Sequence, residues 1–367
     1  MAEVPRVERT DQFLDKILEG RYRIVGELGQ GGMSTVYRAQ QVEGGEDVAV
    51  KILHDELIHD QSQRERFERE ARALFALEHH NILHVHDYGV HEGLPFLVME
   101  LLDGETLDQL VEDAPLPPAE GVDLVRQVLS GLAAAHEQGV LHRDLKTENV
   151  VVVTQPDGSR VAKLLDFGLV KFVDDDRWGE GRALTAFGEV MGTPAYMSPE
   201  QCTGETADAR SDVYAMGAVL FEMLTGEWPF MEESRTEMMR AHLMAPTPKV
   251  ADRRPELHPR PELQALIDRA MAKEVEARFA DAGAMLAALE AIPLPVATVH
   301  QQLQGPSNAG DAAPAEAYRP TEPMRLPSLP PKSGRPAPVA RLLLIGGGLL
   351  VLLFAAAALA FLVLSSI

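Results

Sequence analysis

One short loop carries several side chains suited to chemistry. Within residues 142–149 (HRDLKTEN), Asp144 is a candidate proton acceptor, Lys146 a cation and Asn149 an amide that can bind a metal ion. These are the groups that phosphoryl transfer needs, because that reaction depends on positioning and charge neutralisation more than on a covalent nucleophile. The loop therefore predicts a phosphoryl-transfer site.

Other charged and flexible positions fit the same chemistry. Asp166, in a D-F-G triplet, follows seventeen positions after Asn149, and Lys51 ends the apolar run VAV far upstream. The glycines of residues 29–36 (GQGGMSTV) let backbone N–H groups approach a polyphosphate, because no Cβ stands in the way. Alone, this segment is also compatible with an ordinary glycine-rich hairpin.

In this order, the motifs resemble those of the eukaryotic-type (Hanks-type) serine/threonine protein kinases, including bacterial members with the G-x-G-G-M-S variant. Ser198-Pro199-Glu200 resembles the A-P-E motif, and the stretch 211–217 (SDVYAMG) resembles the start of a family helix. The resemblance covers about residues 22–291. It implies an α+β, two-lobed kinase fold with a β-rich N-lobe that contains one main helix and an α-rich C-lobe.

The resemblance implies a role for each catalytic position. Asp144 would accept or orient the proton of the attacking hydroxyl, and Lys146 would steady the transferring phosphoryl group. Lys51 would contact the α- and β-phosphates, and Thr193 would touch the catalytic aspartate and lysine. Asn149 and Asp166 would bind Mg²⁺, with Mn²⁺ as the alternative, because both offer oxygen donors to a hard cation.

The partner expected for Lys51 is a glutamate on the following helix. Phe67 and Leu74 lie 3 and 4 positions from Glu70 on one helical face, whereas Glu68 lies about 200° away around the helix. Glu70 is therefore preferred over Glu68.

ATP is the expected nucleotide, held between the lobes by apolar side chains, hinge backbone groups and the glycine-rich loop. The residues expected to contact it, besides Asp166, are Leu28, Gly29, Gln30, Gly31, Gly32, Met33, Ser34, Val36, Ala49, Lys51, Met99, Glu100, Leu102 and Val151. Two positions depart from the family pattern. Ser34 replaces a glycine and Thr147 replaces the most frequent proline, but neither change removes a catalytic group.

Regulation and bracing involve a second set of residues. Thr185 is the only hydroxyl residue between Gly168 and Gly192, and a phosphate on it could pair with Arg143. The unmodified loop threonine is the simpler alternative. By the resemblance, Asp212 would brace the catalytic-loop backbone and Glu200 would pair with Arg278.

Short β-branched stretches separated by glycine turns predict strands at 22–28, 35–39 and 47–52. Apolar spacing predicts helices at about 62–77, 121–137 and 261–271. The expected divisions are an N-terminal extension (1–21), a kinase domain (22–292, with an N-lobe at 22–100 and a C-lobe at 101–292), a linker (293–341), a transmembrane helix (342–364) and a tail (365–367).

The predicted membrane helix, residues 342–364, contains 23 residues without a charge, about 35 Å of helix at 1.5 Å per residue. Of the 49 residues before it, 11 are proline, which predicts a disordered tether. Basic residues on this flank predict a kinase domain in the cytoplasm and a C-terminus outside. Ala356 and Ala360 offer small faces for a homodimer, in which one copy would phosphorylate the other.

Composition limits the possible partners and cross-links of the chain. The net charge of −22 argues against nucleic acid as a partner, and a single cysteine, Cys202, excludes an intrachain disulfide. The expected partners are proteins with serine or threonine acceptors. Two alternatives stay open: a pseudokinase scaffold that binds nucleotide without turnover, and a small-molecule phosphotransferase with the same fold.

Overall fold

The computed structural model describes residues 12–32, 34–55, 61–112, 114–167, 194–255 and 261–293. All of them belong to one compact unit. Three predicted site residues, Met33, Thr185 and Thr193, lie outside the described residues. So do the predicted linker from residue 294 onward, the predicted membrane helix 342–364 and the tail. Within the described part of the chain, no helix is long and apolar enough to span a bilayer.

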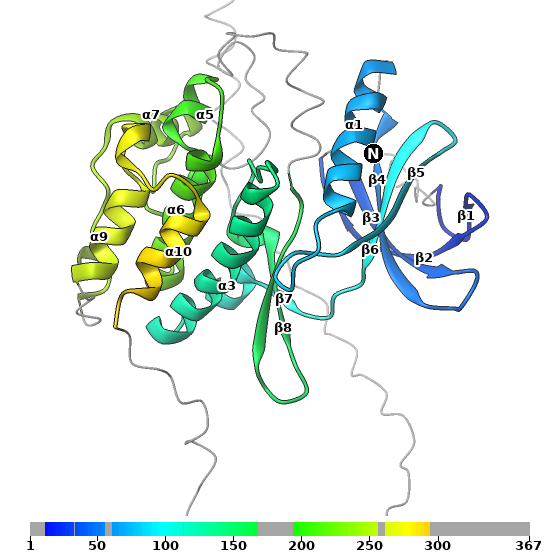
Figure 1. Ribbon diagram of the computed structural model, residues 1–367, viewed down its shortest axis with the longest axis horizontal. Helices are drawn as coiled ribbons and strands as arrows, with labels where there is room; N and C mark the ends of the chain where they lie inside the picture. The colour runs from blue at the N-terminus through cyan, green and yellow to red at the C-terminus, as the bar shows by residue number, and fades with distance from the viewer. Residues whose placement is uncertain are drawn as a thin grey trace, which may run out of the picture. The chain divides into compact units, whose positions relative to one another are not determined.

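The N-lobe is built on one antiparallel sheet with the strand order β1-β2-β3-β4-β6-β5 (Figure 1). Its strands are β1 (Ile17–Leu18), β2 (Tyr22–Gln30), β3 (Ser34–Gln41), β4 (Asp47–Leu53), β5 (Val85–His91) and β6 (Leu94–Glu100). All residues of the central strand β4 after Asp47 are buried. β1 lies in the stretch predicted as N-terminal extension, so the sheet begins earlier than expected.

One long helix, α1 (Gln61–Phe75), packs against β5 and β6. Phe67, Ala71 and Leu74 are spaced 4 and 3 positions apart, and all three are buried. This spacing places an apolar stripe on one side of a 3.6-residue helix. The helix agrees with its predicted range to within two residues.

The C-lobe is mostly helical. Its helices are α2 (Leu107–Glu112), α3 (Pro118–Glu137), α5 (Pro199–Thr203), α6 (Ala209–Thr225), α7 (Arg235–Met244), α8 (Val250–Arg253), α9 (Pro261–Ala270) and α10 (Ala282–Glu290). Short 3-10 turns are η2 (Thr147–Asn149), η4 (Pro194–Tyr196) and η6 (Val275–Ala277). A small antiparallel sheet joins β7 (Glu105–Thr106), β8 (Val150–Thr154) and β9 (Arg160–Leu164).

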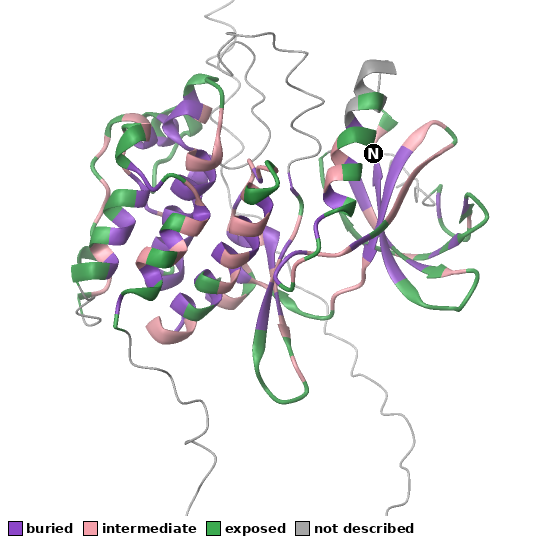
Figure 2. Cartoon of the chain, viewed as in Figure 1, coloured by how far each residue is buried: buried purple, intermediate pink, exposed green. Residues whose placement is uncertain are grey.

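Helix α6 forms the centre of this lobe, and α3, α8, α9 and α10 pack around it. Every residue from Ser211 to Thr225 is buried. Figure 2 shows such buried residues, in purple, along the strands of the sheet and on the sides of the helices that face one another. A capping box of Asp208 and Ser211 starts α6, and Gly226, with φ +76°, ends it in the left-handed conformation.

Residues 81–83, which precede β5 of the N-lobe, are hydrogen-bonded to β9 of the C-lobe. The backbone N–H of Leu83 donates to the carbonyl of Leu164 in β9 (2.9 Å), and Asn81 Nδ2 donates to the carbonyl of Ala162 (2.9 Å). The end of β9 is thereby fixed just before Asp166. The β-rich N-lobe and helical C-lobe agree with the predicted two-lobed kinase fold.

Candidate active site

Lys51 and Asp166 form an ion pair between the sheet and the segment that follows β9. Lys51 lies in β4 with a side chain 10% exposed, and its Nζ is 2.5 Å from Asp166 Oδ1. Desolvation opposes ionisation of the carboxylate, but the charge and hydrogen bond of Lys51 outweigh it and lower the pKa of Asp166 below its ordinary value. Asp166 is therefore ionised at neutral pH.

The expected ion pair between Lys51 and Glu70 is not formed among the described residues. Glu70 lies on the inner side of α1, as predicted, because its side chain is 24% exposed whereas Glu68 is exposed. Its Oε1 is 4.0 Å from Arg69 Nε. The prediction of the helical face agrees with the structure. The predicted pair is not among the described contacts, in which the Lys51 ammonium is bound by Asp166.

Asp212 of α6 holds the backbone of the catalytic loop, residues 142–149. The two carboxylate oxygens of Asp212 accept hydrogen bonds from the backbone N–H groups of His142 (2.8 Å) and Arg143 (2.7 Å). His136 Nε2 contacts the same carboxylate at 3.0 Å. Burial opposes ionisation of Asp212, but these hydrogen bonds and the two imidazoles lower the pKa of Asp212. Asp212 occupies the bracing position that the resemblance implied.

Two backbone conformations at the site are unusual. Arg143 has φ +62° and Asp166 has φ +48°, both in the left-handed region that costs a non-glycine residue about 1 kcal/mol or more. His142 is fully buried between them, and its Nε2 donates to the carbonyl of Leu165 (2.7 Å). This bond ties the catalytic loop to the segment that carries Asp166.

Asp144, Lys146 and Asn149 lie together in the loop. Asn149 Nδ2 donates to the backbone carbonyl of Asp144 (2.7 Å) and lies 3.3 Å from Asp144 Oδ2. Lys146 Nζ is 3.9 Å from the same carboxylate oxygen. Because Nδ2 is directed to Asp144, Oδ1 is the Asn149 atom that can serve a cation. The carboxylate of Asp144 stays 37% exposed, so a substrate hydroxyl could reach it.

The glycine-rich segment forms the turn between β2 and β3. Gly29 pairs with Val36 and Gln30 with Thr35, and the N–H of Gly31 donates to the carbonyl of Ser34 (2.8 Å). Gly31 and Gly32 are exposed. The Gly31 N–H is thus bonded within the turn, and Ser34, which is buried, begins β3.

The residues expected around the adenine follow β4 and the hinge. Ala49 and Met99 are buried and opposite each other in β4 and β6, and Leu28 is exposed. The side chain of Glu100 is engaged elsewhere, since its Oε1 accepts from Lys163 Nζ (2.9 Å). The backbone N–H of Glu100 is also engaged, since it donates to the carbonyl of His84 (3.0 Å). Leu102 and Val151 are partly buried.

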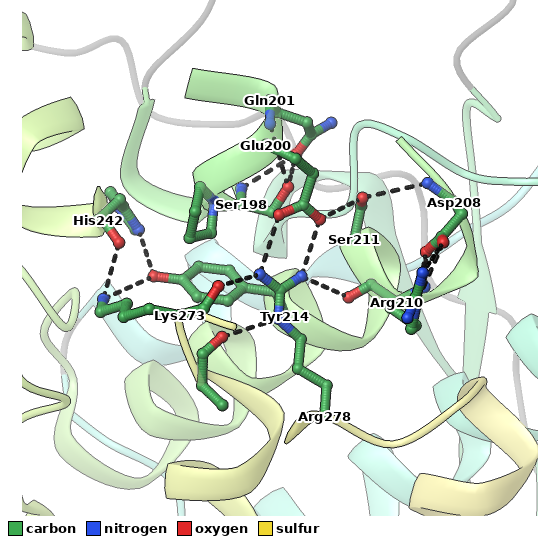
Figure 3. A network of polar contacts seen from close by, with 12 residues as sticks. Ser198, Glu200, Gln201, Asp208, Arg210, Ser211, Tyr214, His242, Lys273 and Arg278 are labelled. Atoms are coloured by element: carbon green, nitrogen blue, oxygen red, sulfur yellow. Dashed lines mark hydrogen bonds and ion pairs between the residues drawn. The ribbon is translucent and has the colours of Figure 1, made fainter. Parts of the chain in front are cut away.

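Glu200 and Arg278 form a buried bidentate ion pair at the end of the activation segment, the stretch from Asp166 to Glu200 (Figure 3). Arg278 Nη1 and Nη2 donate to Glu200 Oε1 (2.8 Å) and Oε2 (2.9 Å). The remaining donors reach the carbonyls of Arg210, Ala272 and Lys273, so all five N–H bonds have acceptors. Burial opposes ionisation of Glu200, but the hydrogen bonds from Arg278 and Ser211 lower the pKa of Glu200.

A buried polar chain runs from the catalytic loop into α6. Thr147 Oγ1 is 2.8 Å from the Tyr196 hydroxyl, which donates to Glu222 Oε2 (2.6 Å). Trp228 Nε1 also donates to that hydroxyl (3.2 Å). Burial, with a smaller contribution from the charge of Glu148, raises the pKa of Glu222 to about 7. Thr147, noted above as a departure from the family pattern, therefore has a hydrogen-bonding role.

Sequence reasoning did not find Tyr196, Glu222 or Gln201. Tyr196 lies in η4 and Glu222 in α6. The sequence signal for their network was a carboxylate within an otherwise apolar helix. For Gln201 the signal was local: Ser198 and Gln201 have the S-x-x-Q spacing of a capping box. Cys202 is buried, and burial raises the pKa of its thiol to about 12.

Comparisons with known proteins identify relatives of this chain. The protein kinase domain family matches residues 22–289. The serine/threonine-protein kinase pkn3 of Myxococcus xanthus is 39% identical over 289 residues, which cover 78% of this chain and 52% of pkn3. The serine/threonine-protein kinase PknL of Mycobacterium tuberculosis (strain ATCC 25618 / H37Rv) is 38% identical over 313 residues, or 84% of this chain and 75% of PknL.

Among solved structures, the PknI kinase domain of Mycobacterium tuberculosis is similar, with a TM-score of 0.59 and 28% sequence identity. The similarity covers 75% of this chain and 97% of that domain. This chain thus spans about half the length of pkn3, and nearly the whole of the PknI kinase domain has a counterpart in it.

Proposed function

This chain belongs to the protein kinase family, and on that premise we propose that it transfers the γ-phosphate of ATP to serine and threonine hydroxyls of proteins. Its relatives at 36–39% identity are named serine/threonine-protein kinases of bacteria, among them one from Myxococcus xanthus and one from Lactococcus lactis. This favours an active kinase over a pseudokinase.

The observation that carries the proposal is the arrangement of four side chains. Lys51 is ion-paired with Asp166, while Asn149 bonds to Asp144. The two pairs are linked through the backbone, because the N–H of Leu165 donates to the carbonyl of Asn149 (2.8 Å). A cation, two candidate metal ligands and a candidate base therefore lie on segments tied together by hydrogen bonds.

The donor set suits Mg²⁺, which binds one or two protein oxygens and keeps phosphate and water ligands. Asn149 Oδ1 and the Asp166 carboxylate would hold the ion, whose chemistry is to neutralise charge on the phosphates. Mn²⁺ accepts the same oxygen ligands. Among the described residues there is no cluster of three or more His, Cys, Asp and Glu side chains that could hold a metal ion, so phosphate oxygens would have to supply further ligands.

The other residues act by position and charge. Asp144, whose side chain is 37% exposed, would accept the proton of the attacking hydroxyl, and Lys146, with Nζ 3.9 Å from the Asp144 carboxylate, would add positive charge beside it. Lys51 would hold the phosphates, and the exposed glycine-rich turn at Gly31 and Gly32 would cover them. Because the transition state is loose, orientation and charge neutralisation supply most of the rate enhancement.

The test is phosphate transfer from γ-labelled ATP by the purified full-length chain with Mg²⁺. We expect label on serine and threonine, and loss of the label in Asp166→Asn, which keeps the size of the side chain but not its charge. Nucleotide binding without any transfer would contradict the proposal and favour the pseudokinase. Transfer to small molecules alone would favour the small-molecule phosphotransferase.

We also propose that residues 342–364 anchor the kinase domain to the cytoplasmic membrane. The support is their uncharged 23-residue length and the proline-rich segment before them. Membranes from cells that express the full chain should retain it after washing at alkaline pH. A chain truncated after residue 292 should instead be released, and retention of that truncated chain would contradict the anchor.

Phosphorylation of Thr185 is proposed as the activating event. Arg143 is adjacent to the catalytic Asp144, so a phosphate on Thr185 that paired with Arg143 would order the activation segment. Mass spectrometry should find phosphate on Thr185 after incubation with ATP, and Thr185→Ala should lower activity.

If the small faces at Ala356 and Ala360 support a homodimer, a kinase-inactive copy should be phosphorylated by an active one.

A further inference from the structure

Gln201 is hydrogen-bonded at both ends of its side-chain amide. Its Oε1 accepts from the backbone N–H of Ser198 (3.1 Å) and from Ser198 Oγ (3.2 Å), which completes the capping box of α5. Its Nε2 donates to the backbone carbonyl of Arg143 in the catalytic loop (2.8 Å). The two partners fix the amide orientation, because a reversed amide would set N–H against N–H and oxygen against oxygen.

The acceptor of this bond belongs to the peptide unit that leads directly into Asp144. A peptide unit is planar, so its carbonyl oxygen and the next N–H rotate together. Here Gln201 binds the carbonyl of Arg143, and the N–H of Asp144 on the other side of the plane donates to the carbonyl of His142 (2.8 Å). Both edges of the peptide plane are therefore fixed.

Residue 143 needs such restraint. Its φ of +62° is unfavourable for a non-glycine residue and persists only where surrounding structure holds it. Asp212 holds the N–H of Arg143 from α6, and Gln201 holds its carbonyl from α5. The two helices thus hold the backbone of Arg143, one through its N–H and the other through its carbonyl.

Helix α5 is itself firmly placed. Glu200, next to Gln201, forms the buried pair with Arg278 and accepts from Ser211 Oγ (2.5 Å) at the start of α6 (Figure 3). A donor mounted on this helix therefore has a defined position relative to the catalytic loop.

We infer that Gln201 is a positioning residue for the phosphate transfer proposed above: through the Arg143 carbonyl, it sets the orientation of the peptide plane that carries Asp144. The inference rests on the proposed function for its catalytic consequence. It goes beyond the capping role, which uses only the Oε1 atom.

Two substitutions separate the two ends of the amide. Gln201→Glu keeps an acceptor for the cap but replaces the donor by an oxygen that repels the Arg143 carbonyl. Gln201→Lys keeps a donor within reach of that carbonyl but loses the cap acceptor. The control is Thr203→Val, which removes a hydroxyl bonded only within α5, to the carbonyls of Pro199 and Glu200.

The full-length chain is assayed for kcat, KM for ATP and melting temperature. We expect kcat of Gln201→Glu to fall about tenfold at unchanged KM, the loss of one oriented hydrogen bond, although this variant melts no earlier than Gln201→Lys. Gln201→Lys should melt earlier yet keep kcat within about threefold of the wild type. Thr203→Val should keep kcat. If kcat instead follows melting temperature in both Gln201 variants, Gln201 only caps α5 and the inference is overturned.

Hydrogen exchange of the same variants gives a readout that needs no turnover. Exchange at the Asp144 amide should quicken in Gln201→Glu and stay near the wild-type rate in Gln201→Lys. Equal exchange in both variants would overturn the inference even in an active enzyme. Faster exchange in Gln201→Glu, in a chain whose wild type transfers no phosphate, would support the positioning of the loop while the proposed activity fails.

Discussion

Lys51 and Asp166 are 115 positions apart in the chain, and their side chains meet at 2.5 Å. This contact places a buried cation of the N-lobe sheet on the carboxylate that follows β9. Lys51 is buried, and Asp166 is the acidic side chain paired with it among the described residues. The lowered pKa of Asp166 therefore depends on Lys51.

Lys51→Met should abolish most activity without unfolding the chain. The substitution keeps an apolar side chain of similar length in β4, but it removes the phosphate contact and the cation beside Asp166. We expect kcat/KM to fall about 100-fold or more, with a melting temperature close to that of the wild type. Lys16→Met, which breaks an exposed pair with Glu92, is the control and should leave activity unchanged. Retained activity in Lys51→Met would contradict the assignment.

Glu200→Gln should destabilise the C-lobe strongly. It leaves the buried guanidinium of Arg278 without its anionic partner, and removing one member of a buried pair typically costs about 3–5 kcal/mol. Urea unfolding of the variant measures this loss. The matched control is Arg160→Gln, because Arg160 and Glu120 form an ion pair at the surface, where the expected change is below about 1 kcal/mol. Similar losses in the two variants would contradict the importance of burial here.

Asp212→Asn should lower both stability and kcat. An amide offers one oxygen, so it cannot accept from the N–H groups of both His142 and Arg143 in the observed geometry, and its NH₂ group would face one of them. The unpaired donor should cost about 1–3 kcal/mol of unfolding free energy. The kcat should fall about tenfold or more, because the loop before Asp144 loses its support. Unchanged kcat in a folded variant would show that the loop keeps its shape without Asp212.

Glu222 should make stability depend on pH. Burial raises its pKa from 4.5 to about 7 in the folded chain. Between these values the folded state holds a proton that the unfolded state has released, so the free energy of unfolding falls as pH rises from about 4.5 to 7 and then levels off. The full effect is roughly 3 kcal/mol.

Glu222→Gln tests this assignment. Glutamine keeps an acceptor for the Tyr196 hydroxyl but does not ionise. Urea unfolding from pH 5 to 8 should therefore show a shallower decline in the variant, which becomes the more stable of the two proteins above pH 7. A parallel pH dependence in both proteins would assign the titration to another group.

The sequence predicted the elements best where apolar spacing was regular. Predicted helices at 62–77, 121–137 and 261–271 correspond to α1, α3 and α9, with shifts of at most three residues at either end. Periodicity also placed Glu70 on the inner face of α1. It could not predict the missing pair with Lys51, because that depends on the separation of α1 from β4, which packing sets.

Long-range polar contacts were predicted only where the family resemblance supplied them, as for Glu200 with Arg278. The contact between Gln201 and the Arg143 carbonyl spans 58 positions and uses a backbone acceptor, so no side-chain pattern marks it. The same holds for Thr147, Tyr196 and Glu222. Spacing along the chain defines which face of a helix is apolar, but it does not reveal which backbone groups face that helix.

The burial of α6 from Ser211 to Thr225 has a consequence for the dynamics of the whole lobe. A helix with no side open to solvent cannot fray outward or exchange its amide hydrogens through small local openings. Deuterium can enter the backbone of 211–225 only when the surrounding helices separate. Hydrogen exchange in α6 therefore reports the global unfolding of the lobe. The first turn of this helix carries Asp212, which binds the backbone of the catalytic loop.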